Sequence, residues 1–103
     1  MKNSVTFLKP ARNELIDVIS YYNHQSSGLG FDFALEIEKA IDRIDKFPES
    51  WTKLSKGTRK CRCNRFPYSI VYYLQDNSII IVAIMHAKRK PKYWIERLKN
   101  TLI

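Results

Sequence analysis

Apolar residues recur at the spacing of a helix in two consecutive segments of the first half of the chain. The first segment, Ala11–Tyr22, follows Pro10, a residue that suits the first turn of a helix. Glu14 lies early in this segment, where the helix dipole favours an acidic side chain. The second segment, Leu29–Ile44, begins after the short break Ser26–Gly28. Because so short a connection brings consecutive helices side by side, the sequence predicts an antiparallel helical hairpin.

The remaining pattern is that of β-strands. Val5–Leu8, before the first helix, is β-branched and aromatic, and Thr58–Arg65 alternates between polar and less polar positions. Tyr68–Leu74 and Ile79–His86 are rich in aromatic or β-branched residues and flank the polar segment Gln75–Ser78. Two such runs on either side of a polar turn predict a β-hairpin.

The order of these elements predicts an α+β fold. Ile79–Met85 is apolar at every position, so we expect it to be the central strand, covered on both faces. Pro91 interrupts the chain after it, and Tyr93–Leu102 is expected to form a short terminal helix. The expected order is β-α-α-β-β-β-α, with the helical hairpin packed on a small, mostly antiparallel, four-stranded sheet. A chain of 103 residues has room for one domain, which we expect to span residues 1–103.

Composition excludes two classes of protein. A hydrophobic share of 45% is too high for an intrinsically disordered chain. The longest apolar run has seven residues, whereas a membrane-spanning helix needs about 20. The N-terminus shows no signal-peptide pattern, so we expect a cytoplasmic protein with no membrane partner.

The positive charge lies in the second half of the chain. The formal net charge is +8, yet the first 50 residues carry six basic and eight acidic side chains, and the remainder carries twelve basic and two acidic ones. This asymmetry creates a directional field that suits nucleic acid or an acidic protein. The alternative is a solvated basic face without a specific partner.

The cysteines and histidines do not form a metal-binding pattern. Cys61 and Cys63 occupy one face of a predicted strand, where a disulfide between them would be strained. His24 and His86 lie too far apart in the sequence to complete the four-ligand set of a structural zinc site. We therefore expect two reduced, buried cysteines, no metal and no cofactor.

Several short motifs follow one another in a fixed order between about Val5 and Arg97. They are Ala11…Glu14-Leu15, Tyr21-Tyr22, Leu29-Gly30 with Phe33, Phe47-Pro48…Trp51, Arg65-Phe66-Pro67-Tyr68-Ser69-Ile70-Val71-Tyr72 and Ala83-Ile84-Met85-His86-Ala87-Lys88-Arg89-Lys90-Pro91-Lys92-Tyr93-Trp94. This ordered set resembles the RelE/ParE superfamily of bacterial toxins from type II toxin–antitoxin systems, also called plasmid stabilisation proteins. The resemblance implies a RelE/ParE-like fold.

The resemblance implies a toxin but leaves its target open, because one fold can host several functions. RelE-like members are metal-free, ribosome-dependent mRNA endonucleases that block translation, and the long basic side chains favour this function. The first alternative is a ParE-like inhibitor of DNA gyrase without hydrolytic activity. The second is a non-toxic family member that only binds its antitoxin.

Metal-free cleavage of RNA needs groups that transfer protons and cations that stabilise charge on phosphorus. Histidine suits the first task and arginine the second. We expect the catalytic residues to be Arg65, His86, Arg89 and Tyr93. By resemblance, Arg65 corresponds to a charge-stabilising arginine of the nucleases, and His86 to a region that holds catalytic side chains in some of them. The expected nucleic-acid-binding residues are Lys53, Lys56, Lys60, Arg62, Lys88, Lys90 and Lys92.

Each catalytic candidate also has a purely structural interpretation. Arg65 can pair with a helix carboxylate, and His86 can bond to neighbouring backbone. Arg89 can belong to a solvated basic face. Tyr93 can pack within the terminal segment, as we expect of Trp94.

The resemblance also implies a protein partner. Toxins of this superfamily are kept inactive by a cognate antitoxin. The basic surface of this chain suits an antitoxin segment that is extended, acidic and partly apolar. Besides this partner, the expected target is mRNA on the ribosome or, in the alternative, DNA gyrase.

Overall fold

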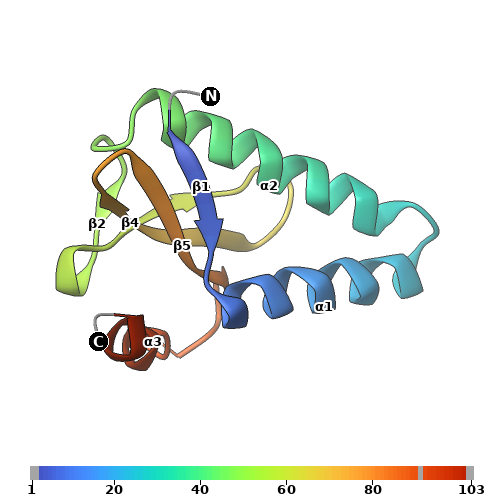
Figure 1. Cartoon of the computed structure of the whole chain (residues 1–103). Coiled ribbons are helices and arrows are strands. Elements are labelled where there is room, and N and C mark those ends of the chain that lie inside the picture. The colour runs from blue at the N-terminus through green and yellow to red at the C-terminus, as the bar shows by residue number, and fades with distance from the viewer. Residues whose placement is uncertain (1–2, 91, 102–103) are drawn as a thin grey trace.

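The computed structural model describes residues 3–90 and 92–101, together with the side chains of these residues as far as Lys99. Three helices, five strands and one short 3-10 turn, η1, follow one another in this part of the chain (Figure 1). Their order is β1 (Ser4–Phe7), α1 (Lys9–Gln25), α2 (Leu29–Lys46), β2 (Thr52–Lys53), η1 (Ser55–Gly57), β3 (Arg59–Arg62), β4 (Tyr68–Gln75), β5 (Ser78–His86) and α3 (Ile95–Thr101).

The five strands form one sheet in the order β1-β5-β4-β3-β2. β1 pairs with β5 in parallel, and every other pair is antiparallel. The predicted α+β fold is therefore confirmed, with five strands in place of the predicted four. The additional strand, β2, consists of Thr52 and Lys53, which pair with Lys60 and Arg59. Two residues are too few to produce an alternating pattern in the sequence.

The predicted helical hairpin covers one face of the sheet. In Figure 1, α1 and α2 run antiparallel beside each other on that side. Gly28 between them has φ 85°, a left-handed conformation that a residue without a Cβ adopts at little cost. Phe33, Ile37 and Ile44 of α2 are almost fully buried against sheet residues such as Ile70. This burial of apolar side chains holds the hairpin on the sheet.

The opposite face of the sheet has a smaller apolar cluster of its own. Val71, Val82 and Ala83 pack there with Trp94 and Leu98, which come from α3 and the turn before it. The prediction that β5 is covered on both faces is confirmed, since residues 79–84 are all buried. β5 is an interior strand, while β4 occupies the middle of the sheet. Trp94 is 2% exposed, as expected of a packing residue.

The boundaries of two predicted elements shift. The strand expected over Thr58–Arg65 is confined to β3, because the chain bends after Arg62. The terminal helix begins at Ile95 instead of Tyr93, and position 102 lies outside the described residues.

Both cysteines are free thiols and both are buried, as predicted. Cys61 and Cys63 belong to the core between the sheet and the helical hairpin. Burial raises the pKa of the Cys63 thiol to about 12, and the neighbouring Cys61 adds to the shift. Both side chains therefore behave as small apolar groups at neutral pH. None of the described helices is long and apolar enough to cross a membrane.

Candidate functional site

Four basic or titratable side chains meet in a cavity at the end of β5. Lys60 comes from β3, His86 ends β5, and Arg89 and Lys92 belong to the segment that follows. The cavity has a volume of about 250 Å³. Its other lining residues are Leu54, Ser55, Met85, Ala87 and Trp94. We call this hollow the basic cavity. Cations gathered in a partly apolar hollow favour an anionic ligand.

A hydrogen bond fixes the tautomer of His86. The backbone N–H of Lys88 donates to Nδ1 of His86 at 3.0 Å. Because Nδ1 accepts this bond, the neutral ring carries its proton on Nε2. The ring also meets Tyr68 edge to face, with the centroids 4.9 Å apart. His86 therefore bonds to neighbouring backbone through Nδ1, as its structural interpretation predicts. Nε2 is left as the donor that His86 can offer to a ligand.

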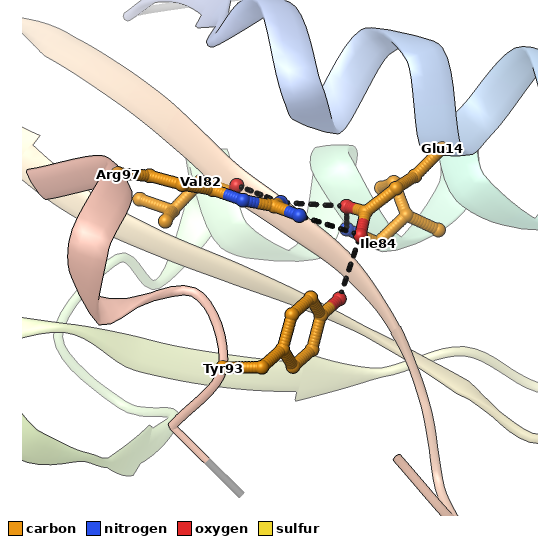
Figure 2. Close-up of polar contacts among 5 residues, drawn as sticks. All are labelled: Glu14, Val82, Ile84, Tyr93 and Arg97. Carbon is orange, nitrogen blue, oxygen red and sulfur yellow. Dashed lines mark hydrogen bonds and ion pairs between the residues drawn. The ribbon is translucent and has the colours of Figure 1, made fainter. Parts of the chain in front are cut away.

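A second polar cluster joins α1, β5 and α3 around the carboxylate of Glu14 (Figure 2). Oε1 of Glu14 accepts hydrogen bonds from Nη1 of Arg97 at 2.8 Å and from the backbone N–H of Ile84 at 3.1 Å. Oε2 accepts from Nη2 of Arg97 and from the hydroxyl of Tyr93, each at 2.8 Å. Nη1 of Arg97 also donates to the backbone carbonyl of Val82 at 2.9 Å.

This Glu14 cluster completes the edge of the sheet. β1 ends at Phe7, opposite Ile81, so β5 has no strand partner on that side beyond this point. A β-bulge in the β4–β5 ladder at the same place leaves Val82 as the extra residue. The bonds from Ile84 and to Val82 therefore satisfy backbone groups of β5 past the last β1 pairing.

The position of Glu14 corrects one sequence interpretation. α1 begins at Lys9, and no acidic residue lies in its first turn. Glu14 therefore does not act on the helix dipole as predicted, because that effect fades beyond the first turn. Its partner is Arg97, whose pKa is raised by the hydrogen bond to Glu14. The two side chains are only 20% and 17% exposed, so the pair is partly shielded from water.

Tyr93 is held inside the Glu14 cluster. Burial, followed by the hydrogen bond and charge of Glu14, raises the pKa of Tyr93 above its ordinary value of 10.0. The guanidinium carbon of Arg89 lies 4.0 Å from the centroid of the Tyr93 ring, and that of Arg97 lies 5.0 Å from it. The hydroxyl therefore stays protonated and donates its hydrogen bond to Glu14.

Arg65 lies outside the basic cavity. It has φ 70° in the connection between β3 and β4, and its guanidinium stands over the ring of Phe66 at 5.3 Å. Nη2 of Arg65 is 3.7 Å from Oδ2 of Asp32, in a pair that is more than half exposed. The structural interpretation of Arg65, pairing with a helix carboxylate, is therefore realised. Arg65 lines a different hollow from the one that contains His86.

The remaining basic candidates are distributed over several places. Lys53 is exposed on the edge strand β2, and Arg62 lines the same hollow as Arg65. Lys56 lines a cavity beside α3. Lys88 and Lys90 are exposed just after β5. Of the predicted site residues, the basic cavity thus unites Lys60, His86, Arg89 and Lys92.

This arrangement can bind an anion and offer it one imidazole donor. Within residues 3–90 and 92–101, no three His, Cys, Asp or Glu side chains gather in a way that could hold a metal ion. The roles of Glu14 and Arg97 were not predicted from the sequence, because a lone Glu in an amphipathic helix has no pattern that identifies a distant partner. The one available signal was that both residues lie within the span of the motifs.

Comparison with protein families gives one match that spans most of the chain. Residues 5–91 match the family described as the ParE toxin of the type II toxin–antitoxin system parDE. The chain therefore belongs to the ParE toxin family. The expectation of a toxin of a type II system from the RelE/ParE superfamily is confirmed at this level. None of the curated proteins with which the chain was compared matches it.

Two solved structures share the fold. The chromosomal ParDE toxin–antitoxin system from P. aeruginosa contains a chain with a TM-score of 0.73 and 14% identity, over 84% of this chain and 98% of that one. The toxin–antitoxin complex RelBE2 from Mycobacterium tuberculosis contains one with a TM-score of 0.58 and 20% identity, over 84% and 99%. At these identities the likeness is one of fold.

Proposed function

We propose that this toxin acts by binding and inhibiting DNA gyrase, without hydrolysing a nucleic acid. The observation that carries the proposal is the position of Arg65, the residue expected to stabilise charge on phosphorus, in a different hollow from the one that His86, Arg89 and Tyr93 line together. The hydroxyl of Tyr93 is bound to Glu14, and Arg65 pairs with Asp32 away from the basic cavity. Membership of the ParE family supports the same choice, since ParE-like toxins inhibit gyrase.

The distribution of charge suits such a macromolecular target. The excess of basic residues follows the helical hairpin in the sequence and occupies the β2–β5 part of the sheet and the segment after it. Gyrase engaged with DNA offers an extended anionic surface nearby, and charge complementarity increases the rate of encounter with such a complex.

A ribosome-dependent mRNA endonuclease remains a second candidate because the basic cavity favours it. Lys60, Arg89 and Lys92 can bind phosphate oxygens there, and Nε2 of His86 can donate a hydrogen bond to a leaving 5′-oxygen. In this mechanism the 2′-hydroxyl loses its proton to water and attacks phosphorus, and the bond to the 5′-oxygen breaks as that oxygen takes a proton from water.

Inducible expression in a bacterium separates the two functions. We expect a DNA-damage response and trapped gyrase–DNA complexes before protein synthesis falls. The His86→Ala variant should remain toxic, because a binding inhibitor does not need a proton donor. Cleaved transcripts with intact DNA, abolished by His86→Ala, would support the endonuclease instead. Normal growth on expression of the wild type would contradict both functions.

We also propose an acidic antitoxin as the protein partner. By their titles, the two similar structures come from a ParDE system and a RelBE2 complex, which supports this assignment. The net charge of +8 favours a partner of opposite sign. Co-expression of a cognate antitoxin is expected to restore growth and to give a complex that dissociates more readily at high salt. Co-purification that is insensitive to salt would contradict a charge-driven interface.

A further inference from the structure

Two basic loops meet at the end of the sheet where β5 terminates. One leads from the last residue of β3 to the start of β4, and the other follows His86. The backbone N–H of Ala87 donates to the carbonyl of Pro67 at 2.8 Å, so the two loops are direct neighbours. Together they present six exposed cations, which we call the cationic rim: Arg62, Arg65, Lys88, Arg89, Lys90 and Lys92.

Most of the rim cations have no counter-ion of their own. Arg65 lies 3.7 Å from Asp32, in a pair that is more than half exposed. Among the side chains that the structure describes, no carboxylate forms an ion pair with any of the other five rim residues. Unpaired cations that are crowded together repel one another, so a bound polyanion lowers their electrostatic energy.

The backbone beneath the rim is held in a defined conformation. The N–H of Lys88 donates to Nδ1 of His86, and the N–H of Arg89 donates to the carbonyl of His86, each at 3.0 Å. Arg65 and Lys92 have φ 70° and φ 67°, a left-handed conformation that is uncommon for such residues and recurs at functional sites. The rim is therefore preorganised for a ligand whose charges have a fixed spacing.

Aromatic rings near the rim are mostly covered. Phe66 and Trp94 are 6% and 2% exposed, and the guanidinium carbon of Arg89 lies over the ring of Tyr93, 4.0 Å from its centroid. Proteins that bind single-stranded nucleic acids use exposed aromatic rings on which the bases stack. A rim that offers cations in place of open rings suits the phosphate backbone of a duplex.

We propose that the cationic rim binds the phosphate backbone of duplex DNA. This assignment rests on the proposed inhibition of gyrase, because gyrase holds the duplex that the rim would contact. A duplex carries one negative charge per about 1.7 Å of its axis, whereas an extended acidic peptide carries at most one per about 3.5 Å. The denser charge makes DNA the better partner for six clustered cations.

Fluorescence anisotropy of a labelled duplex of about 20 base pairs, titrated with the full chain, tests the rim. We expect saturable binding with a Kd of about 10 μM at about 0.1 M NaCl, and weaker binding as salt rises. Single-stranded RNA and polyglutamate, added as competitors at equal total charge, should each be at least about threefold less effective than unlabelled duplex. Absence of saturable binding to the duplex, or equal or better competition by RNA or polyglutamate, would overturn the proposal.

Two rim variants and one matched control locate the contact. Arg62→Gln and Lys88→Gln each remove one exposed cation, one from each loop, and should weaken DNA binding about fivefold and reduce the salt slope by about 1. Lys46→Gln removes the same charge at the opposite end of the sheet, next to the bond between Asn3 and Asp45, and should leave binding unchanged. Equal binding by all four proteins, or an equal loss in Lys46→Gln, would refute the assignment to the rim. Thermal unfolding of each variant checks that the fold is intact.

A gyrase supercoiling reaction with the same proteins separates the rim from the function on which it rests. We expect half-inhibition by Arg62→Gln and Lys88→Gln to need about fivefold more protein than half-inhibition by the wild type, since each variant loses a DNA contact. Inhibition of gyrase by a wild type that does not bind DNA would overturn the DNA contact and leave the proposed function in place. DNA binding without inhibition would contradict the proposed function and support the rim as a DNA-binding surface.

Discussion

A single carboxylate, Glu14, connects three elements that are distant in the sequence. It accepts two hydrogen bonds from Arg97, one from Tyr93 and one from the backbone of β5. Charge-assisted, bidentate pairs of this kind are among the stronger polar contacts in proteins. Because Arg97 and Tyr93 lie in and just before α3, this one residue fixes the terminal segment relative to α1.

Removal of either member of this ion pair should destabilise the fold. We expect Glu14→Ala and Arg97→Ala each to lower the free energy of unfolding by about 3 kcal/mol, since each leaves a partly shielded charge without its partner. The double variant should cost less than the sum of the two. Urea unfolding of the four proteins gives the coupling energy.

The exposed pair of Glu96 and Lys99 is the matched control for this cycle. Its side chains are 79% and 70% exposed, so Glu96→Ala should change the free energy of unfolding by no more than about 0.5 kcal/mol. Additive effects of Glu14→Ala and Arg97→Ala would show that the two residues do not act as a pair.

The buried thiol of Cys63 predicts a loss of stability at alkaline pH. Burial raises its pKa to about 12 in the folded protein, from an ordinary value of 9.0. Above pH 9 the unfolded chain therefore releases this proton first, and the free energy of unfolding falls as the pH rises, by at most about 1.4 kcal/mol per unit from this group.

Urea unfolding between pH 8 and pH 10.5 measures this slope. Cys63→Ala should show a shallower decline than the wild type above pH 9 and the same dependence below it, because only the thiol has been removed. Parallel curves for the two proteins over the whole range would refute the assignment.

At the scale of the elements, a close approach of α1 and α2 fixes the helical hairpin. A Cβ built on Gly30 would lie 2.2 Å from the backbone oxygen of Ile19 and 2.6 Å from Cγ of Asn23. The backbone N–H of Gly30 donates to Oδ1 of Asn23 at 2.7 Å. The two helices can therefore be this close only if position 30 has no side chain.

Gly30→Ala should push the two helices apart. We expect it to lower the free energy of unfolding by about 2 kcal/mol, within the range for overpacked positions. Leu35→Ala on the same helix is the control, since Leu35 is 49% exposed and its loss should cost about 0.5 kcal/mol or less. Thermal unfolding compares the two variants, and equal midpoints would contradict a steric role of Gly30.

The sequence predicted the elements whose residues follow a regular period. The stripe of α2 and the apolar run of β5 identified both elements, because burial in a helix or an interior strand repeats along the chain. β2 has two residues, and the bulge at Val82 depends on pairing with β4, so neither has a period to detect. The Glu14–Arg97 pair joins residues 83 positions apart, and no local pattern encodes such a contact.

At the scale of the whole molecule, acidic and basic residues lie on different parts of the fold. The helical hairpin contains most of the acidic residues, and the β2–β5 region and the segment after it hold most of the basic ones. Lys60, Arg89 and Lys92 gather with His86 in the basic cavity, while Arg65 lies elsewhere. This geometry presents a cationic surface that includes the basic cavity, which suits a toxin that binds its target.

Assays of the purified protein on gyrase and on translating ribosomes test the proposed inhibition of gyrase most directly. Gyrase supercoiling and cleavage-complex formation are followed in one reaction, and the integrity of ribosome-bound mRNA in another. We expect loss of supercoiling with trapped gyrase–DNA complexes and uncut mRNA. Cleaved mRNA together with normal supercoiling would contradict it.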